Sequence, residues 1–209
     1  MESNKGKFIV FEGTDGSGKS TQLKLLSKYL KSKGVETYTT CEPSESPFGG
    51  MLRSCLTGRL ETNEYTIAAL FAADRLDHIF NGVNGIRQKI ESGVTVLCDR
   101  FYLSSLAYNG GIVPSEWVYA LNEQAMKLMR PDLTFFLDLP VEESMNRVGG
   151  RGEQERYETT DRQRIIRQRY YALFPQFEKS DSIKIIKSEA DKNATQAHIR
   201  QEADKLFEF

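Results

Sequence analysis

The chain has 209 residues, 39% of them hydrophobic, and its 28 Lys and Arg residues nearly balance 29 Asp and Glu residues, for a formal charge of −1. This length supports one good hydrophobic core, and the charge balance excludes both a strongly basic nucleic-acid-binding surface and an acidic disordered tail. No apolar run approaches the roughly 18 residues of a transmembrane helix, and no signal-type apolar core follows the N-terminus. Three scattered cysteines suit neither a disulfide framework nor a zinc site. We expect a single-domain cytoplasmic protein over residues 1–209, without membrane or nucleic-acid partners.

Short apolar runs alternate along the chain with longer stretches of helical period. The runs lie at residues 8–11, 94–98, 133–137 and 183–186, with a weaker one at 35–41. Leu23, Leu26 and Leu30 mark a helix that Gly34 would end, and residues 68–80, 117–129, 165–177 and 197–207 also favour helix. Strands that alternate with helices predict an α/β fold with a central five-stranded parallel sheet flanked by helices. Ligands of such sheets bind beyond the carboxyl ends of the strands.

The first predicted strand is followed by a sequence that fits G-x-x-x-x-G-K-[ST] at every fixed position. The candidate ATP-binding residues of this phosphate loop are Gly13, Thr14, Asp15, Gly16, Ser17, Gly18, Lys19, Ser20 and Thr21. Glycines allow backbone N–H groups to curl around a phosphate, Lys19 would neutralise the β- and γ-phosphates, and Ser20 would bind Mg²⁺. A glycine-rich turn with an incidental Lys-Ser is the alternative, which the strand before it and the helix after it disfavour.

Asp99 and Arg100 follow the strand predicted at residues 94–98. A carboxylate at this place is expected to join Ser20 in a magnesium site, and Arg100 could grip a phosphate with two hydrogen bonds. A simple ion pair at the strand end is the alternative. Since Arg100 stands where many mechanical ATPases carry a water-activating Glu, the pair indicates phosphoryl transfer to another anion.

Several further segments, in order along the chain, give it a resemblance to the thymidylate kinases, of the bacterial type with lid arginines. They are residues 11–21, Glu42-Pro43, residues 70–75, Asp99-Arg100, residues 104–108 and residues 130–133. The resemblance implies a P-loop NTPase fold and transfer of a phosphoryl group from ATP to thymidine 5′-monophosphate (thymidylate), for dTTP synthesis. It also implies Mg²⁺ as cofactor and a homodimer.

The resemblance also assigns the thymidylate site. Its residues are Asp15, Arg53, Phe71, Arg75, Arg100, Ser105, Tyr108 and Asn109. Phe71 and Arg75 share a helix face, on which the ring can stack on a pyrimidine and the guanidinium can bind its carbonyl. By position alone Phe71 is better explained as core. A polar helix start is the alternative for Ser105, Tyr108 and Asn109, and a solvated helix charge is the alternative for Arg53. Asp15 has two candidate roles, positioning the acceptor sugar or the waters of the metal.

Residues 147–158 are rich in glycine and charge, which alone indicates an exposed flexible loop. The resemblance implies a short mobile lid whose arginines reach the transferring phosphoryl group, and Gly16 stands where other members carry a phosphate-loop arginine. Arg151 is the expected catalytic arginine beside Lys19, Asp15 and Arg100, with Arg147 and Arg156 assigned to ATP. A loop without a catalytic task is the alternative.

One departure is Cys41, at a position where many bacterial members carry an arginine that contacts the acceptor phosphate. Either Arg100 suffices there, or Lys5 or Arg53 supplies the second cation. Another small-molecule kinase, such as a deoxynucleoside kinase, and a nucleotide-dependent switch are the competing functions. The chain has no Asn-Lys-x-Asp motif to support a GTPase switch.

Overall fold

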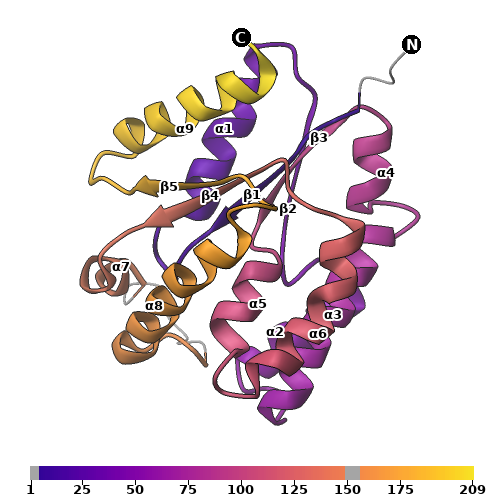
Figure 1. The fold of residues 1–209 in the computed structure, drawn as a ribbon, viewed down its shortest axis with the longest axis vertical. Helices are drawn as coiled ribbons and strands as arrows, with labels where there is room; N and C mark the ends of the chain where they lie inside the picture. The colour runs from indigo at the N-terminus through magenta and orange to yellow at the C-terminus, as the bar shows by residue number, and fades with distance from the viewer. Residues whose placement is uncertain (1–4, 149–155) are drawn as a thin grey trace.

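The computed structural model describes residues 5–148 and 156–209, and within these residues it contains a sheet of five strands (Figure 1). The strands are β1 (Phe8–Glu12), β2 (Thr37–Cys41), β3 (Thr95–Asp99), β4 (Leu133–Asp138) and β5 (Ile183–Lys187). They lie in the order β2-β3-β1-β4-β5, and every neighbouring pair is parallel. The α/β fold with a five-stranded parallel sheet is therefore confirmed.

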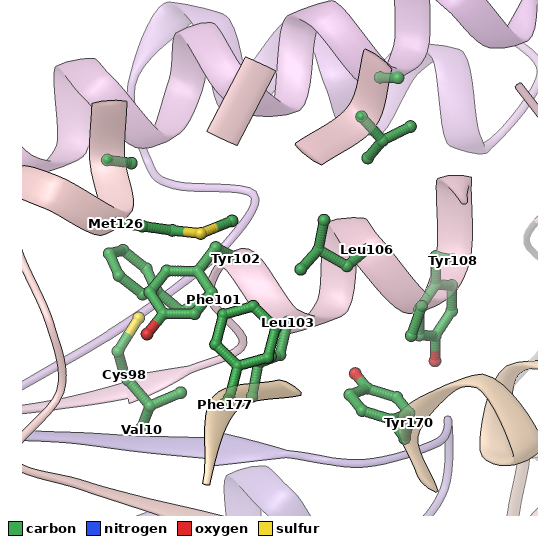
Figure 2. Packing of buried hydrophobic residues seen from close by; sticks show 14 of the residues in the cluster. Val10, Cys98, Phe101, Tyr102, Leu103, Leu106, Tyr108, Met126, Tyr170 and Phe177 are labelled. Atoms are coloured by element: carbon green, nitrogen blue, oxygen red, sulfur yellow. The ribbon is translucent and has the colours of Figure 1, made fainter. Parts of the chain in front are cut away.

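Helices cover both faces of the sheet (Figure 1). On one face, leucines of α1 (Lys19–Ser32) and residues of α9 (Lys192–Phe207) pack against β1, β3 and β4. The other face carries a larger cluster, shown in part in Figure 2, to which α3 (Glu64–Phe80), α5 (Tyr102–Asn109), α6 (Ser115–Leu128) and α8 (Thr160–Phe177) contribute. The central strands are the apolar runs of the sequence because both their faces are covered. The edge strands β2 and β5 are partly exposed and more polar.

The predicted helices begin earlier in the structure than in the sequence pattern. Helix α3 starts at Glu64, where Asn63 accepts a hydrogen bond from the Thr66 N–H at 2.9 Å, and α8 and α9 also start about five residues early. The first turns of these helices are mostly polar, and those of α3 and α9 are capped by a side chain, so apolar periodicity does not mark them. The short helices α2 (Pro47–Leu56), α4 (Ile86–Glu91) and α7 (Val141–Val148) were not predicted. None of the helices in the described ranges is long and apolar enough to cross a membrane.

Candidate active site

The phosphate loop lies at the carboxyl end of β1 and leads directly into α1. Gly13 has a φ of +143°, and a Cβ atom there would come within 2.7 Å of the Leu137 carbonyl oxygen, so this position requires glycine. Gly18, with a φ of +99°, caps the N-terminus of α1. The positive end of the helix dipole therefore faces the loop, which suits an anion.

Lys19 is buried inside this loop. Its Nζ donates to the carbonyl oxygens of Gly13 at 3.1 Å and Thr14 at 2.8 Å. Burial, followed by the charge of Arg100, lowers the pKa of Lys19 to about 8. An anionic ligand would compensate this buried charge, as expected of a group that binds phosphate.

Two oxygen ligands suited to Mg²⁺ meet beside the loop. The Ser20 hydroxyl donates to Oδ2 of Asp99 at 2.6 Å, which joins the start of α1 to the end of β3. The other oxygen of Asp99, Oδ1, is buried and has no hydrogen-bond partner among the described residues. Hard oxygen donors of this kind fit Mg²⁺, which needs only one or two side chains when phosphates and water supply the rest. The described residues hold no cluster of three or more His, Cys, Asp or Glu with metal-site geometry.

Arg100 connects the loop to the neighbouring helix α5. One terminal nitrogen donates to the Gly13 carbonyl oxygen at 3.2 Å and to the Ser104 hydroxyl at 3.1 Å. The other donates to Asp15 and, at 3.1 Å, to the Tyr108 hydroxyl. Its backbone φ is +72°, a left-handed conformation rare outside glycine, so the chain turns sharply here to bring the guanidinium to the loop.

Asp15 is held from several sides. Besides Arg100, it accepts hydrogen bonds from the Tyr108 hydroxyl at 3.1 Å and from Nε2 of Gln163 at 2.6 Å. Burial opposes ionisation of this carboxyl, but the charges of Arg100 and Lys19 outweigh burial and lower its pKa. Asp15 is therefore a fixed anion at the edge of the phosphate loop.

Two cavities adjoin at these residues. One follows the phosphate loop, between Gly16, Lys19 and Thr21 on one side and Cys41 and Asp99 on the other. The second lies beside α5, and its walls include Leu56, Phe71, Ser105, Tyr108 and Asn109. Both cavities are lined by Asp15, Pro43, Arg100 and Glu158. A group bound in one cavity would therefore reach a group bound in the other beside Arg100.

The second cavity combines an apolar wall with an amide. Phe71 is half-buried, packs against the core and also lines this cavity, so its core position leaves room for the predicted stacking on a base, which stays a prediction. Asn109 is buried, and neither its amide nitrogen nor its oxygen has a hydrogen-bond partner among the described residues. An amide that offers one donor group and one acceptor there can bind the polar edge of a pyrimidine.

Arg75 lies behind the cavity and is not among its described lining residues. Its guanidinium pairs with Glu42 at 2.5 Å and donates to Ser105 at 3.0 Å and to Asn122. Arg53 donates to the carbonyl oxygens of Pro43 at 3.0 Å and Ser44 at 2.7 Å. In this structure both arginines hold the walls of the site, and direct contact with thymidylate stays a prediction for each.

Two of the three predicted lid arginines, Arg147 and Arg156, lie in the part of the chain that the structure describes. Arg147 is exposed near the end of α7, and Arg156 donates to Glu64 on α3 at 2.8 Å and is not among the described residues that line the two cavities. Arg151, most of the predicted lid and the two glycines before it lie outside the described residues. ATP contacts by Arg147 and Arg156 therefore stay predictions.

Lys5 is ruled out as the replacement for the missing arginine. It precedes β1 and lines a hollow with Gly93 and Glu208 at the amino ends of the strands, whereas the phosphate loop lies at their carboxyl ends. In a parallel sheet all the carboxyl ends of the strands lie together, so a residue that precedes a strand lies at the opposite end and cannot reach the phosphate loop.

Sequence reasoning missed Gln163 and Glu158. Gln163 is fully buried, binds the Asp15 carboxylate and accepts a hydrogen bond from the Asp15 N–H at 3.0 Å. Nothing in an arginine-rich helix start distinguishes one glutamine, so only the packing of α8 on the loop reveals it. Glu158 falls at the end of the predicted lid, where composition indicates only an exposed loop.

The comparisons with known proteins agree with this geometry. The family model described as thymidylate kinase matches residues 11–199. A thymidylate kinase of Desulfotalea psychrophila is 41% identical over 74% of each chain, and one of Akkermansia muciniphila is 44% identical over 74% of this chain and 73% of its own. A probable thymidylate kinase of the archaeon Thermococcus kodakarensis is 41% identical over 81% of this chain and 85% of its own. The chain belongs to the thymidylate kinase family.

Proposed function

We propose that this thymidylate kinase brings its two substrates together at Arg100. ATP would lie on the phosphate loop, with thymidine monophosphate in the cavity beside α5. The observation that carries this arrangement is that both cavities share Asp15, Pro43, Arg100 and Glu158. An acceptor phosphate and the γ-phosphate of ATP placed on either side of Arg100 would face each other for direct transfer.

The chemistry needs little more than positioning and charge, because phosphoryl transfer proceeds through a loose transition state. An oxygen of the thymidylate phosphate attacks the γ-phosphorus in line, the bond to the β-phosphate oxygen breaks, and ADP leaves. Lys19 and Arg100 would stabilise the negative charge on the transferring group. Asp15 would keep Arg100 in place and orient the acceptor.

Magnesium fits the site formed by Ser20 and Asp99. When bound there with ATP, it would supply positive charge at the β- and γ-phosphates. The protein's own contribution is the 2.6 Å contact that holds the Ser20 hydroxyl against the Asp99 carboxylate at the rim of the loop. A lid arginine, in the bacterial manner, would complete the charge.

Thymidylate recognition would depend on Phe71 and Asn109. The ring stacks on the base, and the unpartnered amide binds the base edge. Tyr108, whose hydroxyl is fixed by Asp15 and Arg100, would pack against the sugar. Arg75 would act on the base side through Ser105, which lines the cavity.

We further propose that two copies pair through α2 and α3. Phe48 and Met51 on α2 are 43% and 47% exposed, and Tyr65 and Phe80 on α3 are 54% and 44% exposed. Exposed apolar and aromatic side chains on two adjoining helices favour a protein interface. Light scattering should give twice the chain mass, and Met51→Lys should shift it toward the monomer.

The activity is tested by ADP release from Mg-ATP with thymidylate, deoxyuridylate, deoxycytidylate and thymidine as acceptors. Thymidylate should give the highest kcat/KM, because a desolvated site discriminates against acceptors that leave its polar groups unpaired. Turnover of thymidine without turnover of thymidylate would identify a nucleoside kinase instead. ADP release that ignores every acceptor would identify a slow hydrolase or switch.

A further inference from the structure

Glu12 is a fully buried carboxylate at the end of β1, directly before the phosphate loop. It is not among the described residues that line either cavity, so direct contact with ATP or thymidylate does not account for a buried carboxylate here. Both of its oxygens are occupied. Oε1 accepts hydrogen bonds from the N–H groups of Phe101 at 2.9 Å and Ser104 at 3.2 Å. Oε2 accepts from the hydroxyls of Ser104 at 2.6 Å and Tyr170 at 2.8 Å.

These bonds cap helix α5 from a different element. All eight residues of α5 are buried, so water cannot satisfy the N–H groups of its first turn, and Phe101 at the N-cap has no side-chain acceptor. The carboxylate of Glu12 takes that place and its charge complements the helix dipole. Ser105, Tyr108 and Asn109 follow on this helix, so their positions depend on where its first turn is fixed.

The same carboxylate also determines the direction of the Ser104 hydroxyl. Because that hydroxyl donates its proton to Glu12, its lone pairs face the nitrogen of Arg100 that donates to it at 3.1 Å. Arg100 is in turn the left-handed residue that begins the turn into α5, and its N–H donates to the Phe11 carbonyl oxygen at 2.9 Å. Glu12 therefore holds the Arg100 side chain through Ser104 and its turn through the Phe101 N–H.

We propose that Glu12 is a positioning residue for phosphoryl transfer: its carboxylate orients Arg100 through Ser104 and fixes the start of α5. The inference rests on the proposed role of Arg100 at the transferring phosphoryl group. A cap alone would need only the acceptor Oε1. The second oxygen, Oε2, accepts from the hydroxyls of Ser104 and Tyr170, and the Ser104 hydroxyl in turn accepts from Arg100. Burial raises the pKa of Glu12, opposed by its hydrogen bonds and by Arg100, so keeping this carboxylate ionised costs stability.

The test is Glu12→Gln, which can keep the Oε1 acceptor and replaces Oε2 with a donor. The Ser104 hydroxyl would then have to turn its proton away and accept from the new amide nitrogen, which disturbs the lone pair that now accepts from Arg100. We expect kcat to fall about ten-fold or more, since small misplacements of reacting groups are costly, with KM for ATP changed by less than about three-fold. A kcat within two-fold of the parent enzyme would overturn the proposal.

A cycle with Arg100→Ala separates positioning from a merely structural role. If Glu12 acts through Arg100, Glu12→Gln should lower kcat by less than about two-fold once Arg100 is absent. Losses that multiply would show that Glu12 acts elsewhere and would also overturn the proposal. Asp181→Asn is the matched control, because it changes another buried carboxylate that accepts from α5, through Tyr102, away from the nucleotide site. It should leave kcat unchanged.

If Glu12→Gln does not fold, Tyr170→Phe carries the same test, since it removes one donor to Oε2 and keeps the ring in the core. The proposal then requires kcat to fall about three-fold or more with Arg100 present and to stay level in the Arg100→Ala background. An unchanged kcat contradicts it. The parent enzyme is measured alongside: lack of thymidylate-dependent turnover there refutes the proposed function, whereas a normal parent with unaffected variants refutes only the positioning role.

Discussion

The two halves of the site are built in different ways. The phosphate loop is one continuous segment, residues 13–21, whose anion-binding character comes from backbone conformation and a helix N-terminus. The acceptor cavity is assembled from side chains on α2, α3, α5 and the segment before α8, far apart in the sequence. A backbone site can be identified from local spacing, whereas a side-chain site exists only when the fold brings its parts together. The two halves should therefore respond differently to substitution.

The largest effect is expected in the phosphate loop. Lys19→Ala should lower kcat by about a thousand-fold, because the charge aimed at the γ-phosphate is lost while the backbone cradle stays. Lys24→Ala, an exposed lysine on the same helix, is the control for folding and should leave kcat unchanged. If Lys19→Ala keeps more than roughly a tenth of the parent kcat, the assigned role of Lys19 is wrong.

In the acceptor half, Arg75→Ala should act first on stability. The substitution leaves Glu42 buried with the His78 imidazole as its remaining side-chain partner among the described residues, and breaking a buried pair from one side costs about 3–5 kcal/mol. Thermal unfolding should show Tm lower by roughly 10 °C. Arg87→Ala breaks an exposed pair with Glu91 and should cost under about 1 kcal/mol. Equal shifts in the two variants would contradict the structural role given to Arg75.

Arg151→Ala tests whether the catalytic charge comes from the lid. We expect kcat to fall about a hundred-fold with thymidylate KM changed by less than about three-fold, as for an interaction made mainly in the transition state. Arg147→Ala and Arg156→Ala measure the other candidates. Arg164→Ala, whose side chain pairs at the surface with Glu142 and Asp161, is the control. The lid-arginine mechanism is refuted if none of the three lid variants loses kcat ten-fold.

The smallest effect concerns the base edge. Asn109→Ala should raise KM for thymidylate about ten-fold, the loss expected for hydrogen bonds in a desolvated cavity, and leave KM for ATP near its parent value. Steady-state kinetics with each substrate varied in turn provides the measurement. A parallel rise in both constants would mean that Asn109 supports α5 generally instead of binding the base.

The two halves of the site also differ in how much of them can be predicted from the sequence. The strands, the phosphate loop and Asp99 could be predicted because local spacing and apolar runs encode them. Contacts between side chains that lie far apart in the sequence could not be predicted. Arg75 was expected in the cavity, yet the fold places it against Glu42, and Gln163 carries no local signal for its contact with Asp15. Lys5 does not qualify as the second cation, because it precedes β1 and lies at the amino ends of the strands.

Helix α5 is buried along its whole length, and its Tyr102, Leu103, Leu106 and Tyr108 belong to the apolar cluster of Figure 2. A segment without solvent contact can exchange its amide hydrogens only when the structure packed around it opens. Amides of α5 should therefore exchange more slowly than those of α7, where Glu142, Glu143, Asn146 and Arg147 are exposed. A drug or mutation that loosens α5 would therefore have to overcome the packing of the large core cluster to which this helix belongs.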